Sequence, residues 1–333
     1  MQPNIENIIL SATGAETIDN STVIQSLWSG YGQIVRLKLV GGAYSSVILK
    51  HIKLPKPGNH PRGWNTDLSH QRKIRSYQVE AYWYEHYARY CTDDCTVPVC
   101  LAVHQQNNET LLVLTDLNSA GFEVRKSSVE IRDIYACLAW LASFHAIYMN
   151  SKAEGLWECG SYWHLDTRPD ELAALNDKAL RLAAPHIDKK LRECRYQTFI
   201  HGDAKLANFC FYRSDFNSNF SQQVAAVDFQ YIGRGCGMKD VAYFISSCLD
   251  EKECETMESQ LLNYYFSALR HQVILKKTDV NMDELEHEWR ELYSFAWADF
   301  YRFIKGWSPG HWKINSYSEK LTKNTIKKLS IIN

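Results

Sequence analysis

The residues with the clearest chemical meaning lie in the segment TFIHGDAKLANFCF, residues 198–211. Apolar residues flank His201-Gly202-Asp203, and Asn208 follows Asp203 with four residues between them. A loop of this length can direct a carboxylate at a hydroxyl group while a carboxamide oxygen turns toward a magnesium ion on phosphates. The spacing therefore makes Asp203 a candidate general base and Asn208 a candidate metal ligand.

A second acidic residue is needed to support this interpretation, because an HGD tripeptide alone also occurs in ordinary loops. The run VAAVDFQYIGRG, residues 224–235, ends an apolar strand with Asp228, and Phe229 follows it. This order resembles the Asp-Phe-Gly of protein kinases, whose carboxylate holds magnesium against the nucleotide phosphates. We therefore expect Asp228 to be the second metal ligand.

In their order and spacing, these motifs resemble the aminoglycoside phosphotransferase and choline kinase superfamily. Its hallmark is an H-G-D-x-x-x-x-N loop followed by a strand that ends in I-D-F or I-D-W. The loop and the later VDFQ are similar to those of its ecdysteroid-kinase-like branch. The resemblance implies a bilobal, protein-kinase-like fold that transfers a phosphoryl group from ATP, with Mg²⁺, to an alcohol group of a small molecule.

The same resemblance gives roles to residues of the amino-terminal part. Val47-Ile48-Leu49-Lys50 is similar to the kinase Val-Ala-Ile-Lys, whose lysine contacts the α and β phosphates, and Lys53 is a competing candidate. The expected partner of Lys50 is Glu80 rather than Glu85, because Glu80 falls where the family has its N-E-x-x-F-Y-like helix start.

Two hairpins are candidates for the loop that covers the phosphates. Gly30 and Gly32, with one residue between them, resemble the start of a G-x-G-x-x-G loop that lacks its third glycine. One hairpin later, Ser45 and Ser46 follow Gly41-Gly42-Ala43-Tyr44, and the family often uses a serine-bearing loop there. Both segments are also typical of ordinary hairpin turns, so the choice stays open.

Further positions take their roles from the resemblance. Leu114-Thr115-Asp116-Leu117 is similar to the family's E-D-L hinge, so we expect the backbone around Asp116 to meet the adenine. Asp240 is expected to anchor the catalytic loop through hydrogen bonds. Lys205 stands where protein kinases have a lysine that steadies the transferred phosphoryl group, and its alternative is a solvated loop charge. Gln230 replaces the glycine of Asp-Phe-Gly, so a conformational flip there is not expected.

These residues require a scaffold of two kinds. The runs VIQSLW, QIVRLKLV, SVILKHIKL, VPVCLAVHQ and ETLLVLTDL predict antiparallel strands, and RKIRSYQVEAYWYEHYARY predicts a helix. From about Ser128 the apolar spacing is helical. The predicted fold class is therefore α+β. A nucleotide-binding lobe, residues 1–117, holds a five-stranded antiparallel sheet and one helix, and a larger, mainly helical catalytic and substrate-binding lobe spans residues 118–333.

The composition of the chain indicates which kinds of binding partner to expect. The 333 residues include 37 Lys and Arg against 38 Asp and Glu, so no excess of positive charge favours nucleic acid or anionic lipid. The start MQPNIENIIL lacks the pattern of a secretory signal, no segment is apolar enough to span a bilayer, and ten scattered cysteines suit a reducing compartment. We expect a cytoplasmic monomer or homodimer without disulfide bonds.

The acceptor is the least determined feature. The segment YSFAWADFYRFIKGWSPGHWKIN, residues 293–315, concentrates aromatic side chains that mostly belong to a core. Because the superfamily builds its acceptor pocket from carboxy-terminal helices, some of them favour an apolar or amphipathic alcohol such as a steroid. Cation–π binding leaves a choline- or ethanolamine-type kinase open. The acidic run from Asp250 to Glu258 leaves an aminoglycoside-type kinase open, although it is more typical of a solvated helix start.

Two other classes of protein fit the sequence less well. A pseudokinase that acts as a nucleotide-binding interaction module is the alternative of another class, but such a protein has no need for Asp203, Asn208 and Asp228 together. A kinase for protein side chains would need an activation segment ending in Ala-Pro-Glu, and the stretch between Asp228 and Lys239 is too short for one.

Overall fold

The chain divides into two compact units that are interleaved in sequence. The computed structural model describes residues 3–27, 30–53, 67–106, 108–213 and 222–332. The first unit comprises residues 1–125, 210–218 and 225–230, and the second comprises residues 126–209, 219–224 and 231–333. A functional boundary after residue 117 stays a prediction.

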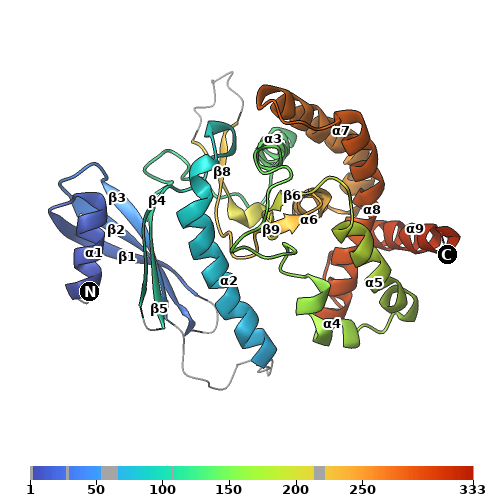
Figure 1. Cartoon of the computed structure of the whole chain (residues 1–333), viewed down its shortest axis with the longest axis horizontal. Coiled ribbons are helices and arrows are strands. Elements are labelled where there is room, and N and C mark those ends of the chain that lie inside the picture. The colour runs from blue at the N-terminus through green and yellow to red at the C-terminus, as the bar shows by residue number, and fades with distance from the viewer. Residues whose placement is uncertain (1–2, 28–29, 54–66, 107, 214–221, 333) are drawn as a thin grey trace. The chain divides into compact units, whose positions relative to one another are not determined.

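Within its described residues, the first unit contains the predicted five-stranded antiparallel sheet, in the order β1-β2-β3-β5-β4 (Figure 1). Alternate residues of its strands enter the core, as Val35, Leu37 and Leu39 do on the second strand. The prediction of this sheet is confirmed. The strands are β1 (Thr17–Ser26), β2 (Gly32–Val40), β3 (Ser46–Lys53), β4 (Cys100–Gln106) and β5 (Glu109–Thr115).

Helices α1 (Pro3–Thr13) and α2 (Asp67–His86) lie on opposite faces of this sheet (Figure 1). Ile5 and Ile9 of α1 pack against the face of β3 that carries Val47 and Leu49. Only α2 was expected, so the prediction of one helix is corrected by α1. An 11-residue helix is marginal by itself, and α1 gains its stability from the sheet, which a local pattern does not reveal.

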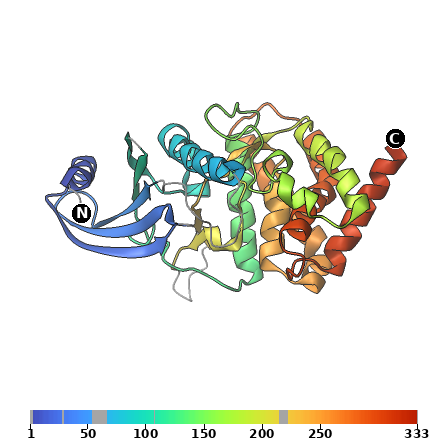
Figure 2. The ribbon, with the colours of Figure 1, turned by 90° about the horizontal axis from the view of Figure 1, so that it is seen from below.

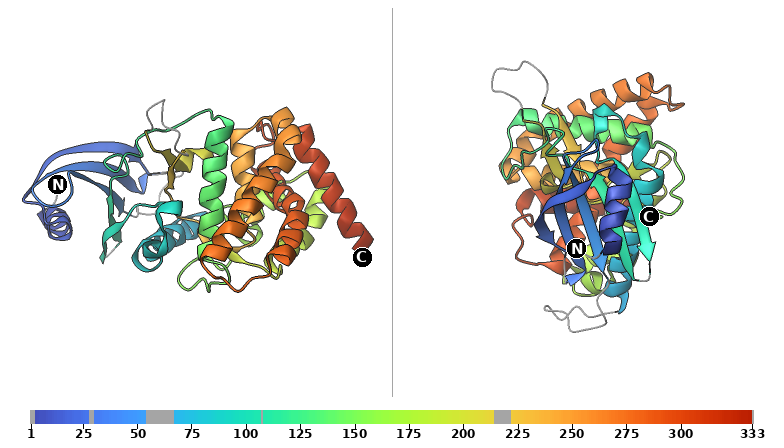
Figure 3. Two further views of the ribbon diagram at one scale, coloured as in Figure 1. Left: turned by 90° about the horizontal axis from the view of Figure 1, so that it is seen from above. Right: turned by 90° about the vertical axis from the view of Figure 1, so that its left-hand side faces the viewer.

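The second unit is mainly helical, as expected. Helix α8 packs against α4, α5, α6 and α9, and α3 packs against α7. Figures 2 and 3 show α9 running beside α8 at the carboxy-terminal end of this unit. The helices are α3 (Ile131–Ile147), α4 (Pro169–Ala173), α5 (Lys178–Arg192), α6 (Met238–Cys248), α7 (Glu251–Leu275), α8 (Met282–Trp307) and α9 (Ser316–Ile332).

Short strands hold the loops that carry the motifs. Strand β6 (Thr198–Ile200), which ends directly before His201, pairs with β9 (Gly233–Gly235), and β7 (Phe209–Phe211) pairs with β8 (Val224–Ala226). Single 3₁₀ turns cover Ala88–Tyr90, Asp93–Cys95, Leu165–Thr167 and Leu206–Asn208. Across the residues that the structure describes, no helix combines the length and the apolar character needed to cross a membrane.

One close approach between helices supplies a test of this packing. A Cβ atom added to Gly306 of α8 would lie 1.9 Å from the backbone oxygen of Glu171 in α4. The substitution Gly306→Ala gains about 0.5–1 kcal/mol of helix propensity, but forcing the helices apart costs about 1–3 kcal/mol. Urea denaturation should therefore show a lower free energy of unfolding.

The matched control is Gly310→Ala, because a Cβ atom at Gly310 would meet nothing within 4 Å. We expect this variant to unfold within about 0.5 kcal/mol of the wild type. Equal stability of the two variants would contradict the close packing of α4 on α8.

Candidate active site

A buried carboxylate fixes the start of the loop at residues 201–208. Asp240, in the first turn of α6, is fully buried and accepts hydrogen bonds from the backbone N–H groups of His201 (2.6 Å) and Gly202 (2.9 Å). The same carboxylate lies 3.3 Å from Nε2 of His145. These bonds are those expected of the anchoring residue, and they compensate the cost of burying a charge.

Gly202 is required by the shape of this loop. Its φ of +77° lies in the left-handed region, and an added Cβ atom would stand 2.2 Å from the backbone oxygen of Tyr231. Any side chain at this position would push the loop away from the Tyr231 backbone. The requirement for glycine in the HGD motif is therefore steric, and it comes from the close approach of the Tyr231 backbone.

The structure brings the predicted residues of the loop into contact with one another. Asn208 donates through Nδ2 to the backbone oxygen of Asp203 (2.8 Å) and to its Oδ2 (3.1 Å), while Lys205 Nζ lies 2.9 Å from the same Oδ2. Oδ1 of Asn208 takes no part in these bonds and is the atom suited to a metal ion. Asp203 and Asn208 are each 6% exposed, so the loop holds both side chains in defined positions.

A second set of predicted residues meets in the first unit. Lys50 of β3 forms a buried ion pair with Glu80 of α2, with Nζ–O distances of 2.7 and 2.9 Å, and lies 3.6 Å from Oδ1 of Asp228. Burial acts to lower the pKa of Lys50, but the carboxylates of Glu80 and Asp228 outweigh it and raise the pKa. The amine therefore stays charged. Lys53, its competitor, is exposed and pairs with Glu109.

Asp228 has a backbone conformation that is uncommon for a residue with a side chain. Its φ is +72°, in the left-handed region, and such strain occurs often at functional sites. The two following residues are fixed to α2. Phe229 stacks on Trp83 with ring centroids 4.8 Å apart, and Oε1 of Gln230 accepts a hydrogen bond from Lys73 (2.8 Å). These contacts hold Phe229 and Gln230 against α2, and the expectation that no flip need occur there stays a prediction.

The two glycine hairpins occupy different ends of the strands. Gly30 lies in the turn between β1 and β2, and Gly32 pairs with Ile52, two residues along β3 from Lys50. Ser46 begins β3 at the other end, four residues from Lys50, or about 13 Å at the rise of a strand. Trp28 and Ser29, part of the first hairpin, lie outside the described residues.

The second hairpin makes structural contacts. Ser45 closes it by accepting a backbone hydrogen bond from Leu39 (2.9 Å), and a Cβ atom on Gly42 would stand 2.8 Å from the backbone oxygen of Gly14. This hairpin therefore packs against the chain between α1 and β1. Its serines are not brought near Lys50.

The carboxylate of Asp116 joins this structural group. It accepts hydrogen bonds from Arg36 Nε (2.6 Å), Ser46 Oγ (2.7 Å) and the backbone N–H of Asn118 (3.0 Å). Burial acts to raise the pKa of Asp116, but Arg36 and these hydrogen bonds outweigh it and lower the pKa. The side chain of Asp116 thus holds the residues directly after β5, and the role of its backbone toward adenine stays a prediction.

A cavity of about 520 Å³ opens beside the catalytic loop, within the second unit. Asp203 and Lys205 form part of its wall, so a molecule bound there would meet the candidate base. Aromatic side chains make up a large part of the remaining wall. The aromatic lining residues are Tyr162, Tyr231, Tyr243, Phe300, Trp307 and Trp312.

Only some of the aromatic residues in this wall were predicted from the sequence. Phe300, Trp307 and Trp312 belong to the aromatic segment singled out from the sequence, whereas most of that segment is core, as expected. Tyr162 and Tyr243 were missed, because isolated tyrosines far apart along the chain carry no spacing signal. Burial and the nearby Asp203 carboxylate raise the pKa of the Tyr243 hydroxyl, so it stays protonated beside the base.

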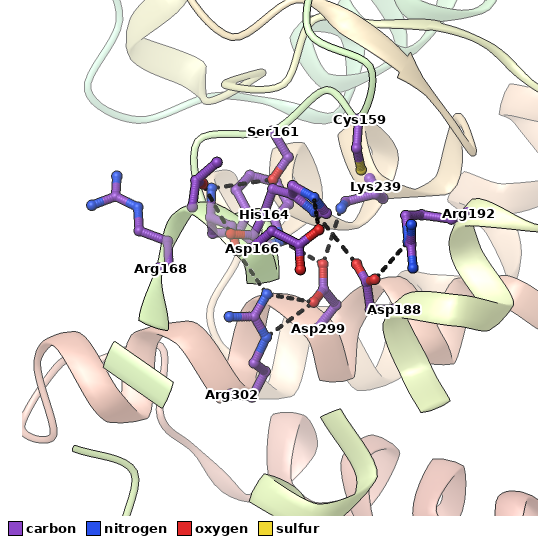
Figure 4. Close-up of polar contacts among 12 residues, drawn as sticks. Cys159, Ser161, His164, Asp166, Arg168, Asp188, Arg192, Lys239, Asp299 and Arg302 are labelled. Atoms are coloured by element: carbon purple, nitrogen blue, oxygen red, sulfur yellow. Dashed lines mark hydrogen bonds and ion pairs between the residues drawn. The ribbon is translucent and has the colours of Figure 1, made fainter. Parts of the chain in front are cut away.

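A buried ionic network lies beside the loop that carries Ser161 and His164 (Figure 4). Asp299 of α8 binds Lys239 (3.1 Å) and Arg302 (2.8 Å) and accepts from the indole N–H of Trp163 (2.9 Å). Burial acts to raise the pKa of Asp299, but the two cations outweigh it and lower the pKa to about 2. The network holds Trp163 and its neighbour Tyr162 in place.

The same network extends to α5 through His164. Its Nδ1 lies 3.4 Å from Oδ1 of Asp188, whose Oδ2 pairs with Arg192 (2.7 Å) (Figure 4). Potential ligand atoms of Cys159, His164 and Asp188 lie within 4.8 Å of one another. Because Arg192 and the nearby Lys239 already supply positive charge, we interpret this cluster as an ion-pair network rather than a metal site.

Three solved structures share the fold of this chain. The choline kinase of Cryptosporidium parvum Iowa II aligns with a TM-score of 0.56 at 12% identity, over 99% of this chain and 96% of its own. Amicoumacin kinase, in complex with AMP-PNP, Ca²⁺ and Ami, aligns with a TM-score of 0.53 at 11% identity, over 100% of this chain and 94% of its own. The GDP complex of aminoglycoside 2'-phosphotransferase-IIIa aligns with a TM-score of 0.50 at 11% identity, over 98% of each chain. The chain has the protein-kinase-like fold of these small-molecule kinases.

The family match falls on the motif region. Residues 160–279 match the Ecdysteroid kinase-like family, and this range contains the catalytic loop, Asp228 and Asp240. The resemblance to the ecdysteroid-kinase-like branch, predicted from the motifs, is confirmed over these residues. The solved structures confirm the fold that the resemblance to the superfamily implied. No curated protein sequence matches the chain significantly.

The ion pair of His164 gives the stability of the protein a defined pH dependence. Burial acts to lower the pKa of His164, but the contacts with Asp188 and Cys159 outweigh it and raise the pKa from 6.5 to about 9. The stabilisation is therefore complete below about pH 6.5 and is lost as the pH rises through about 9, a change on the order of 3 kcal/mol.

Urea denaturation of the wild type and of His164→Gln at several pH values should show this difference. We expect the stability gap between the two proteins to narrow between pH 6.5 and 9. A gap that stays constant over this range would mean that His164 is not held as an imidazolium.

Proposed function

We propose that this protein is an ATP- and Mg²⁺-dependent phosphotransferase with an alcohol group as acceptor. The observation that carries the proposal is the position of Asp203, in a loop fixed by Asp240 and at the wall of a cavity that can hold a small molecule. The fold shared with small-molecule kinases supports the same class of reaction.

In this proposal Asp203 acts as the general base. Its carboxylate accepts the proton of the acceptor hydroxyl, the freed oxygen attacks the γ-phosphorus of ATP, and ADP leaves. Lys205, whose ammonium lies 2.9 Å from that carboxylate, is placed to stabilise negative charge on the transferred phosphoryl group. Most of the rate comes from holding acceptor and phosphate in line.

The nucleotide roles rest on the residues around Lys50. We assign Lys50 to the α and β phosphates, held in position by its buried ion pair with Glu80. The hairpin of Gly30 and Gly32 is preferred over that of Ser45 and Ser46 as the phosphate-covering loop, because the second hairpin packs against the chain between α1 and β1. The backbone around Asp116 is assigned to the adenine.

Asn208 and Asp228 are assigned to Mg²⁺. Carboxylate and carboxamide oxygens are ligands that this hard cation prefers, and each residue is held by its own surroundings. Bound magnesium would neutralise charge on the β and γ phosphates. Amicoumacin kinase, of the same fold, is named with AMP-PNP and Ca²⁺, which fits a nucleotide and a divalent cation.

The aromatic wall of the cavity favours an apolar or amphipathic alcohol as acceptor. Apolar area of a ligand that lies against Tyr162, Tyr243 and Phe300 is removed from water, which supplies binding energy in proportion to that area. A choline-, ethanolamine- or aminoglycoside-type kinase is the alternative within the same reaction class.

We further propose that the protein works in a reducing, cytoplasmic setting. All ten cysteines lie among the described residues as reduced thiols. Burial raises the pKa of several thiols, to about 11 for Cys210 and to about 12 for Cys254, so these groups stay protonated and unreactive.

Loss of the base should abolish turnover without loss of the nucleotide site. We expect Asp203→Asn to lower kcat by about 10²–10⁴-fold, because the carboxamide cannot take the proton. Calorimetric titration should show that a nonhydrolysable ATP analogue binds with Mg²⁺ within about threefold of the wild-type Kd. Asp279→Asn, at an exposed position between α7 and α8, is the control. If Asp203→Asn turned over at the same rate as Asp279→Asn, the proposal that Asp203 is the general base would be contradicted.

The two lysines of β3 provide a second test. We expect Lys50→Met to weaken binding of the ATP analogue by about tenfold or more, because a charge-assisted contact to phosphate is lost. Lys53→Met removes an exposed lysine of the same strand, and its Kd should stay at the wild-type value. Circular dichroism checks that Lys50→Met remains folded. Equal nucleotide affinity of the two variants would contradict the assignment of Lys50.

A further inference from the structure

The charges on the wall of the cavity have one predominant sign. Lys126, Lys205 and Lys313 line it, whereas Asp203 is its acidic residue within the described part of the chain. Two of the three lysines have a carboxylate partner. Lys126 pairs with Asp133 (2.7 Å) and Lys205 pairs with Asp203 (2.9 Å).

Lys313 is the exception. Among the residues that the structure describes, no carboxylate oxygen lies within 4.0 Å of its Nζ, and its polar contact is with Ser246 Oγ at 3.3 Å. The ammonium group instead lies over the rings of Tyr243 (4.7 Å), Phe300 (5.2 Å) and Trp312 (5.6 Å). Its positive charge therefore reaches the cavity without a compensating anion beside it.

The surroundings of Lys313 act against its charged form. Burial, followed by repulsion from Lys205, lowers the pKa of Lys313 to about 8, although the carboxylate of Asp203 acts in the opposite direction. At neutral pH the group is still mainly protonated. A ligand anion beside Nζ would relieve the cost of this burial.

The outer part of the cavity is apolar and exposed. The large side chains of Trp307 and Trp312 are 41% and 58% exposed, and both line the cavity. Indole rings at the mouth of a pocket can cover the apolar body of a ligand. The cavity thus combines aromatic side chains with the ammonium group of Lys313, which lies over three of their rings.

On the basis of the proposed function, we infer that the acceptor is an amphipathic alcohol that carries an anionic group such as a carboxylate. Its apolar body lies against the aromatic wall, its hydroxyl faces Asp203, and its anionic group binds Lys313. A positive charge on the ligand would be repelled by Lys313, Lys205 and Lys126. The choline and aminoglycoside kinases of the same fold are named for cationic compounds, so this chain departs from them in the charge of its acceptor.

Three probes that share one steroid body separate charge from shape. Cholic acid offers hydroxyl groups and a carboxylate, its methyl ester is neutral, and its amide with ethylenediamine is a cation. Isothermal titration calorimetry at pH 7 should give the lowest Kd for the acid, with about 10- to 100-fold weaker binding of the ester and still weaker binding of the amine.

Lys313→Met should remove this preference. We expect the Kd of the acid to rise about 10- to 100-fold and that of the ester to change less than threefold, while Lys313→Arg restores binding of the acid. Lys305→Met is the matched control, because Lys305 pairs with Asp177 and does not line the cavity. Its affinities for all three probes should equal those of the wild type.

Binding and turnover distinguish the two claims. Tight, Lys313-dependent binding of the acid without any consumption of ATP would contradict the proposed phosphotransferase and leave the anion preference in place. Phosphorylation of the ester or the amine with a KM equal to or lower than that of the acid would overturn the anion preference alone. An effect of Lys313→Met on the KM of ATP rather than on the acid would also overturn it.

Discussion

The buried carboxylate of Asp240 is the interaction on which the catalytic loop depends. Without its partners, a charge with no exposed surface would be too costly to keep. The backbone N–H groups of His201 and Gly202 supply the compensation, and the loop can adopt no other course while they do so. This constraint also positions Asp203 and Asn208, since both follow Gly202 within six residues.

Each unit stabilises its own part of the proposed chemistry in a different way. In the second unit, hydrogen bonds and the left-handed backbone of Gly202 shape the loop. In the first unit, the buried Lys50–Glu80 ion pair and the packing of Phe229 on α2 hold the lysine and Asp228. Both arrangements use interactions that are costly to break singly, because removal of one partner leaves a buried charge or an unfilled space.

The motifs could be predicted from the sequence because their geometry is local. Asp203 and Asn208 are separated by four residues, and this spacing indicated both. Lys50 was assigned from its resemblance to the kinase Val-Ala-Ile-Lys, with Lys53 as a competitor. The sheet followed from the alternating pattern of its strands. Helix α1 was missed because it is short and depends on the sheet for its stability.

The cavity could not be predicted, because tertiary packing assembles it. Tyr162, Tyr243 and Lys313 come from a loop, α6 and the segment after α8, and no pattern links such distant positions. The network around Asp299, which holds Trp163 beside Tyr162, likewise joins residues separated by more than one hundred positions. The candidate residues of the loop could therefore be named from the sequence, whereas the lining of the cavity required the structure.

The most direct measurement of the central claim is the detection of a phosphorylated product. The purified protein is incubated with ATP, Mg²⁺ and a pool of amphipathic hydroxyl compounds that differ in charge, and the pool is analysed by mass spectrometry. The account predicts that at least one alcohol gains the mass of a single phosphate ester while ATP is converted to ADP in equal amount. ATP converted only to ADP and free phosphate, or no consumption of ATP with any alcohol in the pool, would contradict it.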